Sequence, residues 1–229
     1  DSSIRRRRFA LTQHPRQVAL VVDSAASLPV QTAQLPRLYI VPMQLNIDGK
    51  TYLDGLDLTV PDFYKKLRGM KSTPLTSSPA PTSFLNAFET ASVEADDILC
   101  LTVSSKFSST HDSANAAAAE AKEILPNTRI EILDTETAAG AEGLIVTQAL
   151  RSVMNGDSLD EVLAACRLVV AKISLLAFLD TLYYVWKGGR VLGVTHAVAS
   201  VLKVKPLLDM ARGEVTTVDR PRTTARAKE

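Results

Sequence analysis

Cysteine is scarce in this sequence. The 229 residues include two cysteines, Cys100 and Cys166, and each lies within an apolar stretch. Because no C-x-x-C pair is present, the sequence has neither the ligand spacing of a structural zinc site nor a disulfide framework. Two reduced cysteines in a protein core are the simpler interpretation, and reduced cysteines are typical of a cytoplasmic protein.

The sequence also lacks an excess of charge and any long apolar run. Lys and Arg number 26 against 25 Asp and Glu, so the formal net charge is +1. A nearly neutral chain is not typical of a protein that binds nucleic acid or a membrane surface. No apolar run approaches the length of about 20 residues that a membrane-spanning helix needs. Aromatic residues make up 5% of a chain that is 46% hydrophobic, which predicts a mostly aliphatic interior.

Signatures of nucleotide binding and hydrolysis are missing as well. There is no G-x-x-x-x-G-K-[ST] loop and no G-x-S-x-G elbow, and GGRVLG at 188–193 differs in spacing from G-x-G-x-x-G. The three histidines are His14, His111 and His196. His111 follows a serine-rich segment, so a hydrolase or acyltransferase that uses Ser108 and His111 stays open as an alternative. No carboxylate is clearly placed to orient that histidine.

The basic run at 5–8 resembles part of a twin-arginine export signal. The residues at 14–16, HPR, interrupt the apolar region that such a signal requires. We therefore expect residues 1–16 to form a solvated basic tail, with contact to acidic lipid as the alternative.

Apolar runs that alternate with helical patterns predict an α/β fold with a largely parallel sheet flanked by helices. The expected strands are 18–22, 38–55 with an Asp48-Gly49 turn, 97–103, 129–134 and 173–180. The expected helices are 60–69, 84–95, 111–125, 137–154, one opened by a capping box at Ser158 and Glu161, 181–189 and 194–203. The segment 71–83 is expected to be a loop, and 204–219 a hairpin that turns at Arg212-Gly213. These elements predict an N-terminal α/β domain at 17–155 and a second, smaller α/β domain at 156–229.

Hydroxyl side chains crowd residues 104–110, SSKFSST, where an expected strand is followed by a helix. In open α/β sheets, ligands bind beyond the carboxyl ends of strands. The first turn of a helix has unpaired N–H groups that favour an anion. One of Ser108, Ser109 and Thr110 could simply cap the helix, but a cap needs only one hydroxyl. The remaining hydroxyls are compatible with an anion site, so a helix cap and an anion site both stay open as interpretations.

Two further polar segments share this ambiguity. Thr76-Ser77-Ser78-Pro79 has hydroxyls beside a proline, which is also the composition of an ordinary turn. In Lys187-Gly-Gly-Arg190, the glycines allow a sharp bend, and the guanidinium suits a carboxylate or phosphate. A solvated surface arginine is the ordinary alternative.

The order of these segments along the chain resembles the DegV (FakB) family. The segments are VVDSAASLP, IVPMQLNIDGKTYLDG, TSSPAPTSF, SSKFSST, ILDTETAAG, KGGRV and VKPLL, and the resemblance runs from about Val18 to the last residue. It implies a two-domain bacterial protein that holds a long-chain fatty acid, such as palmitate or oleate, in a tunnel between its domains. No catalytic residue and no cofactor is implied. A partner ATP-dependent fatty acid kinase would phosphorylate the carboxylate, and the acyl phosphate would enter phospholipid synthesis in the cytoplasm.

The resemblance also assigns roles to residues. By resemblance, the fatty-acid carboxylate would be held by Thr76, Ser77, Ser108, Ser109, Thr110 and Arg190. The basic residues that could face the kinase are Lys187, Lys203 and Arg222, although scattered surface charges explain any one of them.

Some positions depart from the family pattern. Ser109 stands where the family usually has glycine, and Ala80 where it often has serine. Leu192 and Gly193 replace more polar or basic residues, which would alter recognition of the kinase. A histidine late in the family's second domain has no counterpart before Glu229, so we expect the second domain to be incomplete in this chain.

Overall fold

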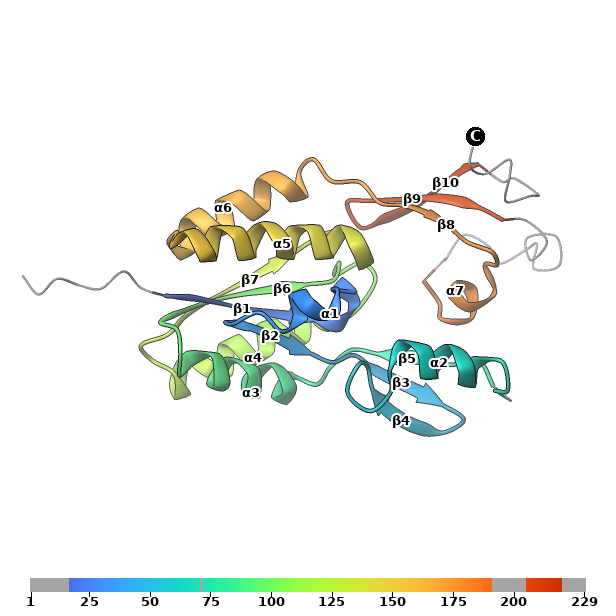
Figure 1. Ribbon diagram of the computed structural model, residues 1–229, viewed down its shortest axis with the longest axis horizontal. Coiled ribbons are helices and arrows are strands. Elements are labelled where there is room, and N and C mark those ends of the chain that lie inside the picture. The colour runs from blue at the N-terminus through green and yellow to red at the C-terminus, as the bar shows by residue number, and fades with distance from the viewer. Residues whose placement is uncertain (1–16, 71, 191–204, 220–229) are drawn as a thin grey trace, which may run out of the picture.

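A four-stranded parallel sheet forms the centre of the molecule (Figure 1). The computed structural model describes residues 17–70, 72–190 and 205–219. The strands run in the order β2-β1-β6-β7 and are β1 (Val18–Asp23), β2 (Leu38–Val41), β6 (Asp97–Thr102) and β7 (Arg129–Asp134). Every residue of β1 and β6 is buried, as expected for parallel strands that are covered on both faces. The prediction of a largely parallel sheet is confirmed.

Helices cover both faces of this sheet. On one face lie α5 (Ala139–Asn155) and α6 (Leu159–Val170), and on the other α3 (Pro81–Ser92) and α4 (Thr110–Ile124) (Figure 1). Successive residues of β1 point to opposite faces, so Leu20 packs with α5 and α6 while Val21 packs with α3 and α4. The flanking helices of the prediction are therefore present as two layers, each with its own apolar core.

The first helix after residue 155 packs into the core of the N-terminal part. The capping box predicted at its start is present, and Glu161 Oε2 accepts hydrogen bonds from both the backbone N–H and the hydroxyl of Ser158. Leu159, Val162 and Cys166 share one apolar cluster with residues of α5 and β1. The domain boundary at 155/156 stays a prediction, and this packing favours a boundary after α6.

A small antiparallel sheet lies between β2 and α3 in the chain. Its strands, in the order β4-β3-β5, are β3 (Gln44–Ile47), β4 (Lys50–Leu53) and β5 (Leu75–Ser77). The predicted turn is present, with Asp48 and Gly49 both at positive φ. Strand β5 forms inside a segment predicted as a loop, because its backbone pairs with β3. Helix α2 (Val60–Leu67) lies between β4 and β5 in the chain, whereas the short helices η1 (Ser24–Ala26) and α1 (Val30–Ala33) lie between β1 and β2.

A third sheet contains the predicted C-terminal hairpin. Its strands, in the order β10-β9-β8, are β8 (Leu176–Phe178), β9 (Leu207–Ala211) and β10 (Glu214–Asp219). The hairpin turns at Arg212 and Gly213, whose φ angles of 54° and 69° fit the predicted tight turn. Helix α7 (Tyr183–Lys187) is shorter than the predicted 181–189, and the predicted helix at 194–203 lies outside the described residues.

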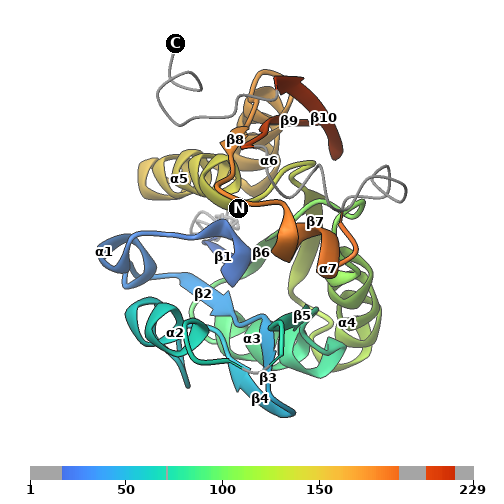
Figure 2. The same ribbon diagram turned by 90° about the vertical axis from the view of Figure 1, so that its right-hand side faces the viewer.

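The two small sheets lie at the carboxyl end of the parallel sheet. In Figure 2, β8, β9 and β10 lie on the side of α5 and α6, whereas β3 and β4 lie on the side of α3. Helix α7 lies between these two sheets in both views (Figures 1 and 2). This end of the molecule therefore brings together segments from the whole length of the chain.

Candidate functional site

The parallel sheet has a switch point between β1 and β6. The chain leaves β1 toward β2 on one side and returns to β6 on the other, so a crevice opens beyond the carboxyl ends of these strands. The carboxylate of Asp23, at the end of β1, accepts hydrogen bonds from Ala25 N at 2.9 Å and Val103 N at 2.8 Å. Asp23 therefore joins η1 to the segment that follows β6. Burial raises the pKa of Asp23 to about 6, although the two backbone hydrogen bonds lower it.

The hydroxyls of the segment after β6 bond mainly to one another and to a neighbouring loop. Ser108 Oγ lies 2.8 Å from Thr110 Oγ1 and accepts a hydrogen bond from Thr110 N at 3.3 Å. Ser109 stands at the N-cap position of α4, but its side chain makes no capping bond and instead lies 2.8 Å from Ser78 Oγ. These hydrogen bonds hold the segment to α4 and to the loop that contains Ser78, with Thr110 buried and Ser108 half-buried.

Thr76 and Ser77 lie on strand β5 and point in different directions. Successive side chains of a strand alternate between its faces, so the two neighbours cannot share one environment. Thr76 lines a cavity, whereas the hydroxyl of Ser77 donates to Gln44 Oε1 at 3.2 Å, and both residues are exposed.

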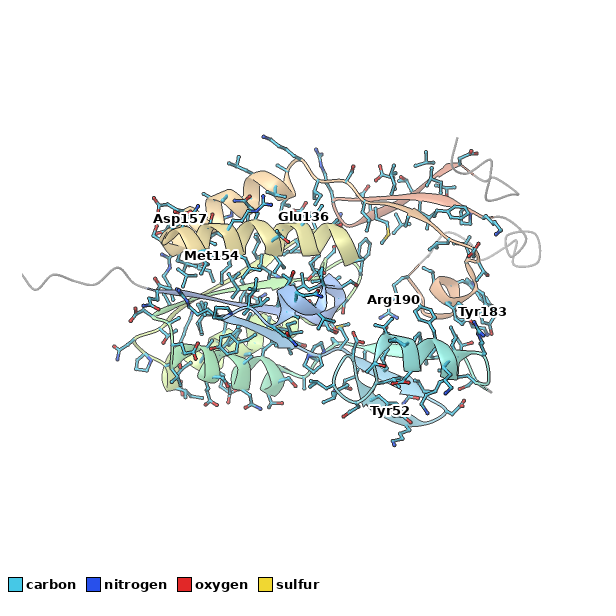
Figure 3. All side chains as sticks on the ribbon, in the orientation of Figure 1. Tyr52, Glu136, Met154, Asp157, Tyr183 and Arg190 are labelled. Carbon is cyan, nitrogen blue, oxygen red and sulfur yellow. The ribbon has the colours of Figure 1, made fainter. Side chains whose placement is uncertain are left out.

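Arg190 links the turn after α7 to the serine-rich segment. Its Nε donates to the carbonyl oxygen of Phe107 at 3.4 Å, and its Nη1 donates to the carbonyl oxygen of Gly188. Gly189 has a φ of 76°, a conformation that suits glycine and turns the chain sharply before Arg190. Figure 3 shows the half-buried Arg190 side chain between the α7 segment and α2.

An apolar cavity of about 250 Å³ brings these segments together. Three of its fourteen lining residues are polar, namely Thr76, Ser108 and Arg190. The other lining residues are aliphatic, aromatic or thioether side chains: Ala25, Met43, Val103, Phe107, Ala138, Ala177, Leu179, Val185, Leu208, Met210 and Val215. An apolar cavity with a few convergent polar groups suits a ligand with an apolar body and a polar end.

A second, wider cavity of about 500 Å³ shares Thr76, Val185 and Arg190 with the first. It extends toward α2, where Phe63 and Tyr64 line it. This cavity was not predicted, because its walls come from β3, β5, α2 and the α7 segment, whose proximity no local pattern predicts. Arg190 consequently lines both cavities.

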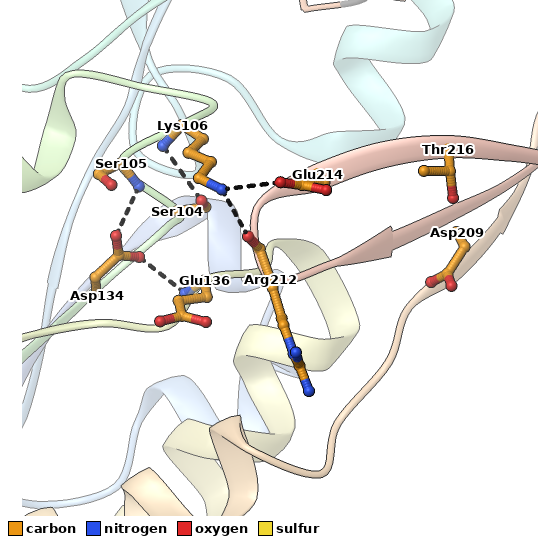
Figure 4. A pocket seen from close by; sticks show the side chains of 9 residues that line it. All are labelled: Ser104, Ser105, Lys106, Asp134, Glu136, Asp209, Arg212, Glu214 and Thr216. Atoms are coloured by element: carbon orange, nitrogen blue, oxygen red, sulfur yellow. Dashed lines mark hydrogen bonds and ion pairs between the residues drawn. The ribbon is translucent and has the colours of Figure 1, made fainter.

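The tip of the β9–β10 hairpin contacts the serine-rich segment and the backbone of Glu136, while Leu208, Met210 and Val215 of the same hairpin line the smaller cavity. Gly213 N donates to the carbonyl oxygen of Glu136 at 2.7 Å. Lys106 Nζ donates to the carbonyl oxygen of Arg212 at 3.3 Å, as Figure 4 shows. A Cβ atom on Gly213 would lie 2.6 Å from Ser104 Oγ. The backbone of the hairpin therefore approaches the serine-rich segment as closely as glycine permits.

A polar cleft of about 790 Å³ lies beside this contact (Figure 4). Its charged side chains are of both signs, with Lys106 and Arg212 against Asp134 and Glu214, and Lys106 Nζ lies 3.5 Å from Glu214. Asp134 accepts hydrogen bonds from the backbone N–H groups of Ser105 and Glu136 in this cleft. Glu136 and Asp209 also line the cleft, so its acidic side chains outnumber its basic ones by four to two.

The geometry does not favour a serine hydrolase. His111 Nδ1 lies 3.0 Å from Thr102 Oγ1, while Ser108 bonds to Thr110. Ser108 and His111 are thus each engaged elsewhere and are not aligned as nucleophile and base. His14 and His196 lie outside the described residues.

The remaining predicted residues divide into two groups. Lys187 is exposed, and its Nζ lies 5.0 Å from the centre of the Trp186 ring. Lys203 and Arg222 lie outside the described residues. Within 17–70, 72–190 and 205–219, no group of three or more His, Cys, Asp or Glu side chains could hold a metal ion, and no helix is long and apolar enough to cross a membrane.

The structure thus brings Thr76, Ser108 and Arg190 to one cavity from three separate segments. Thr110 lies next to them through its bond to Ser108, whereas Ser77 and Ser109 bond to Gln44 and Ser78. Their roles in holding a carboxylate stay predictions.

Comparison with known proteins extends this picture. The family model described as "Uncharacterised protein, DegV family COG1307" matches residues 17–229. A DegV domain-containing protein of Caldanaerobacter subterraneus is 31% identical over 206 residues, which cover 90% of this chain and 72% of that protein.

Solved structures share the same fold. A DegV family protein from Thermus thermophilus, described by its fatty acid binding, is 31% identical with a TM-score of 0.81, covering 93% of this chain and 74% of that one. A fatty acid (stearic acid)-binding protein from Eubacterium ventriosum is 26% identical with a TM-score of 0.85, covering 93% and 73%. The Streptococcus pneumoniae Fatty Acid Kinase (Fak) B3 protein, loaded with linoleic acid, is 22% identical with a TM-score of 0.80, covering 92% and 74%, and shows likeness of fold alone.

Proposed function

Because this chain belongs to the DegV family, we propose that it binds a long-chain fatty acid, such as palmitate or oleate, and presents the carboxylate to a partner ATP-dependent kinase. One observation carries the proposal. Thr76, Ser108 and Arg190 come from three distant segments and are the polar lining residues of an otherwise apolar cavity. Relatives of similar fold that are described as binding fatty acids, from Thermus thermophilus and Eubacterium ventriosum, support the ligand class.

The energetics of a fatty acid suit such a site. Burial of about sixteen carbons at ~0.8 kcal/mol per methylene contributes on the order of 10 kcal/mol before the costs of binding. Burial of an ionised carboxylate is unfavourable unless hydrogen-bond donors satisfy it. In this proposal, the guanidinium of Arg190 and the hydroxyls of Thr76 and Ser108 donate hydrogen bonds to the carboxylate, while the apolar lining residues hold the acyl chain.

A carrier, rather than an enzyme, follows from this assignment. The serine hydroxyls act as hydrogen-bond partners, so turnover would come from the kinase, which forms an acyl phosphate for phospholipid synthesis in the cytoplasm. We assign contact with that kinase to Lys187, which is exposed and lies three residues before Arg190. Arg190 lines both cavities, and the wider cavity gives a second approach to the head group.

The test is mass spectrometry of an organic extract of the purified protein, with an unrelated protein purified in parallel as the control. We expect one long-chain fatty acid per protein, and ATP consumption when a fatty acid kinase is added to the loaded protein. A protein that is empty and takes up neither oleate nor palmitate would overturn the proposal. Ester hydrolysis by the protein alone, abolished in Ser108→Ala, would establish the hydrolase alternative instead.

Ser108→Ala itself is expected to weaken fatty-acid binding. Loss of one hydrogen bond to a charged head group costs about 1.5–3 kcal/mol. Because Ser108 is only half-buried, we take the lower end of this range and expect the Kd to rise by roughly tenfold. Fluorescence titration with a labelled fatty acid measures this change. Ser105→Ala is the matched control, because Ser105 lies in the same segment but does not line the apolar cavity. Equal Kd values for the two variants would remove Ser108 from the head-group site.

A further inference from the structure

A buried acid lies behind the apolar cavity. Glu142, in the first turn of α5, has 0% exposure, and neither of its side-chain oxygens has a hydrogen-bond partner among the residues that the structure describes. An ionised carboxylate in such a place would be strongly unfavourable, because it has lost its water and gained no donor. The proposed function makes no use of this residue.

The titratable groups around Glu142 are acidic as well. Asp23 at the end of β1 and Asp134 at the end of β7 repel its charge, and Cys100 of β6 lies near Asp23 and Glu142. On α6, which packs against α5, Asp160, Glu161 and Arg167 are exposed to solvent. Burial, and then repulsion from the two aspartates, raises the pKa of Glu142 well above its usual value, so folding favours the protonated form of this acid.

Helix α5 touches the cavity wall at the residue next to Glu142. A Cβ atom on Gly143 would lie 2.8 Å from the carbonyl oxygen of Ala26, so α5 and η1 are in direct backbone contact. Asp23 precedes η1 and holds Ala25 and Val103 through their backbone N–H groups. Ala25 and Val103 both line the apolar cavity.

We propose that Glu142 is a positioning residue for this cavity: in its protonated form it allows α5 to pack on η1 and Asp23 to keep its two backbone hydrogen bonds. Ionisation of Glu142 places a second negative charge in the same buried region. Repulsion between Glu142 and Asp23 then loosens the wall formed by η1 and the segment after β6. The effect on ligand rests on the proposed function, whereas the effect on the fold does not.

The sign of the pH dependence follows from the buried acids. A carboxyl whose pKa is raised by folding binds its proton more tightly in the folded state, so its stabilising contribution is present at low pH and is lost as the pH rises. For Asp23, whose pKa rises from 3.8 to about 6 on folding, the stabilising contribution is lost between pH 3.8 and about pH 6. The pKa of Glu142 is also raised by folding, so its stabilising contribution is lost in the same direction, as the pH rises.

Glu142→Gln provides the test, because glutamine has the same size and stays neutral at every pH. Thermal unfolding is followed from mildly acidic to alkaline pH, and we expect the wild-type Tm to fall with rising pH more steeply than that of the variant. The affinity for oleate should fall in wild type by at most about tenfold per pH unit, the limit for one proton, and less in the variant. Glu120→Gln, an exposed glutamate on α4, is the control and should keep the wild-type profile.

Each outcome bears on Glu142 separately from the proposed function. A Glu142→Gln variant with the wild-type pH profile, or one that does not fold, would overturn the positioning role, since a neutral side chain of equal size should be tolerated. If the protein binds no fatty acid but the Tm profiles differ as expected, the proposed function fails and the role of Glu142 in the fold stands.

Discussion

Arg190→Ala should remove most of the affinity for fatty acid. Hydrogen bonds between a guanidinium and a carboxylate contribute about 1.5–3 kcal/mol each, so we expect the Kd to rise by about 10- to 100-fold. The substitution also removes the contacts of Arg190 with the carbonyl oxygens of Phe107 and Gly188, which join the turn after α7 to the serine-rich segment. Isothermal titration with oleate measures the loss.

Two companion variants separate charge from geometry at this position. Arg190→Lys keeps the positive charge but not the planar fork, so we expect an intermediate Kd. Lys187→Ala removes an exposed charge on the same turn and should leave the Kd nearly unchanged. Wild-type affinity in Arg190→Ala would show that the head group binds elsewhere. Equal losses of affinity in Arg190→Ala and Lys187→Ala would mean that any positive charge near the site has the same effect, without a direct contact from Arg190.

Gly213→Ala should detach the hairpin from the serine-rich segment. Gly213 has a φ of 69°, and its new Cβ atom would lie 2.6 Å from Ser104 Oγ, which is itself buried. The left-handed conformation costs a non-glycine residue about 1–2 kcal/mol, and the steric overlap adds about 1–3 kcal/mol. We therefore expect a lower Tm and a weaker affinity for oleate, because Leu208, Met210 and Val215 of the hairpin line the apolar cavity.

The chain contains a matched control for this substitution. Gly49 occupies the equivalent place in the β3–β4 turn with a φ of 81°, and a Cβ atom there would meet nothing within 4 Å. Gly49→Ala should show the conformational cost alone and keep fatty-acid binding. Adding Ser104→Ala to Gly213→Ala removes the overlapping oxygen and should restore part of the Tm. Equal losses of Tm in Gly49→Ala and Gly213→Ala would mean that the close approach at Gly213 has no consequence.

Local patterns in the sequence were sufficient for the framework of the fold. The run of apolar residues in β1 predicts a strand that is covered on both faces, and both hairpin turns follow from residues that tolerate positive φ. The order of the polar segments along the chain was enough to indicate the family, which the match over residues 17–229 confirms. These features depend on residues that are neighbours in the sequence.

Only the tertiary structure decided which side chains reach the cavity. Thr76 and Ser77 look equivalent in the sequence, but pairing of β5 with β3 turns one toward the cavity and the other toward Gln44. Likewise, Glu142 looks like an acid that complements the helix dipole in the first turn of α5. Its burial follows from the contact of Gly143 with Ala26, which no local pattern predicts.

The physical reason is the range of the interactions. Strand, turn and helix-cap patterns arise from the backbone and from side chains a few residues apart, so the sequence by itself determined most of the elements and their order. Strand β5 is an exception, because it depends on pairing with β3. The cavity depends on contacts between residues far apart in the chain, such as Asp23 with Val103 and Phe107 with Arg190. These long-range contacts decided that Thr76, Ser108 and Arg190 line one cavity and that Glu142 is buried.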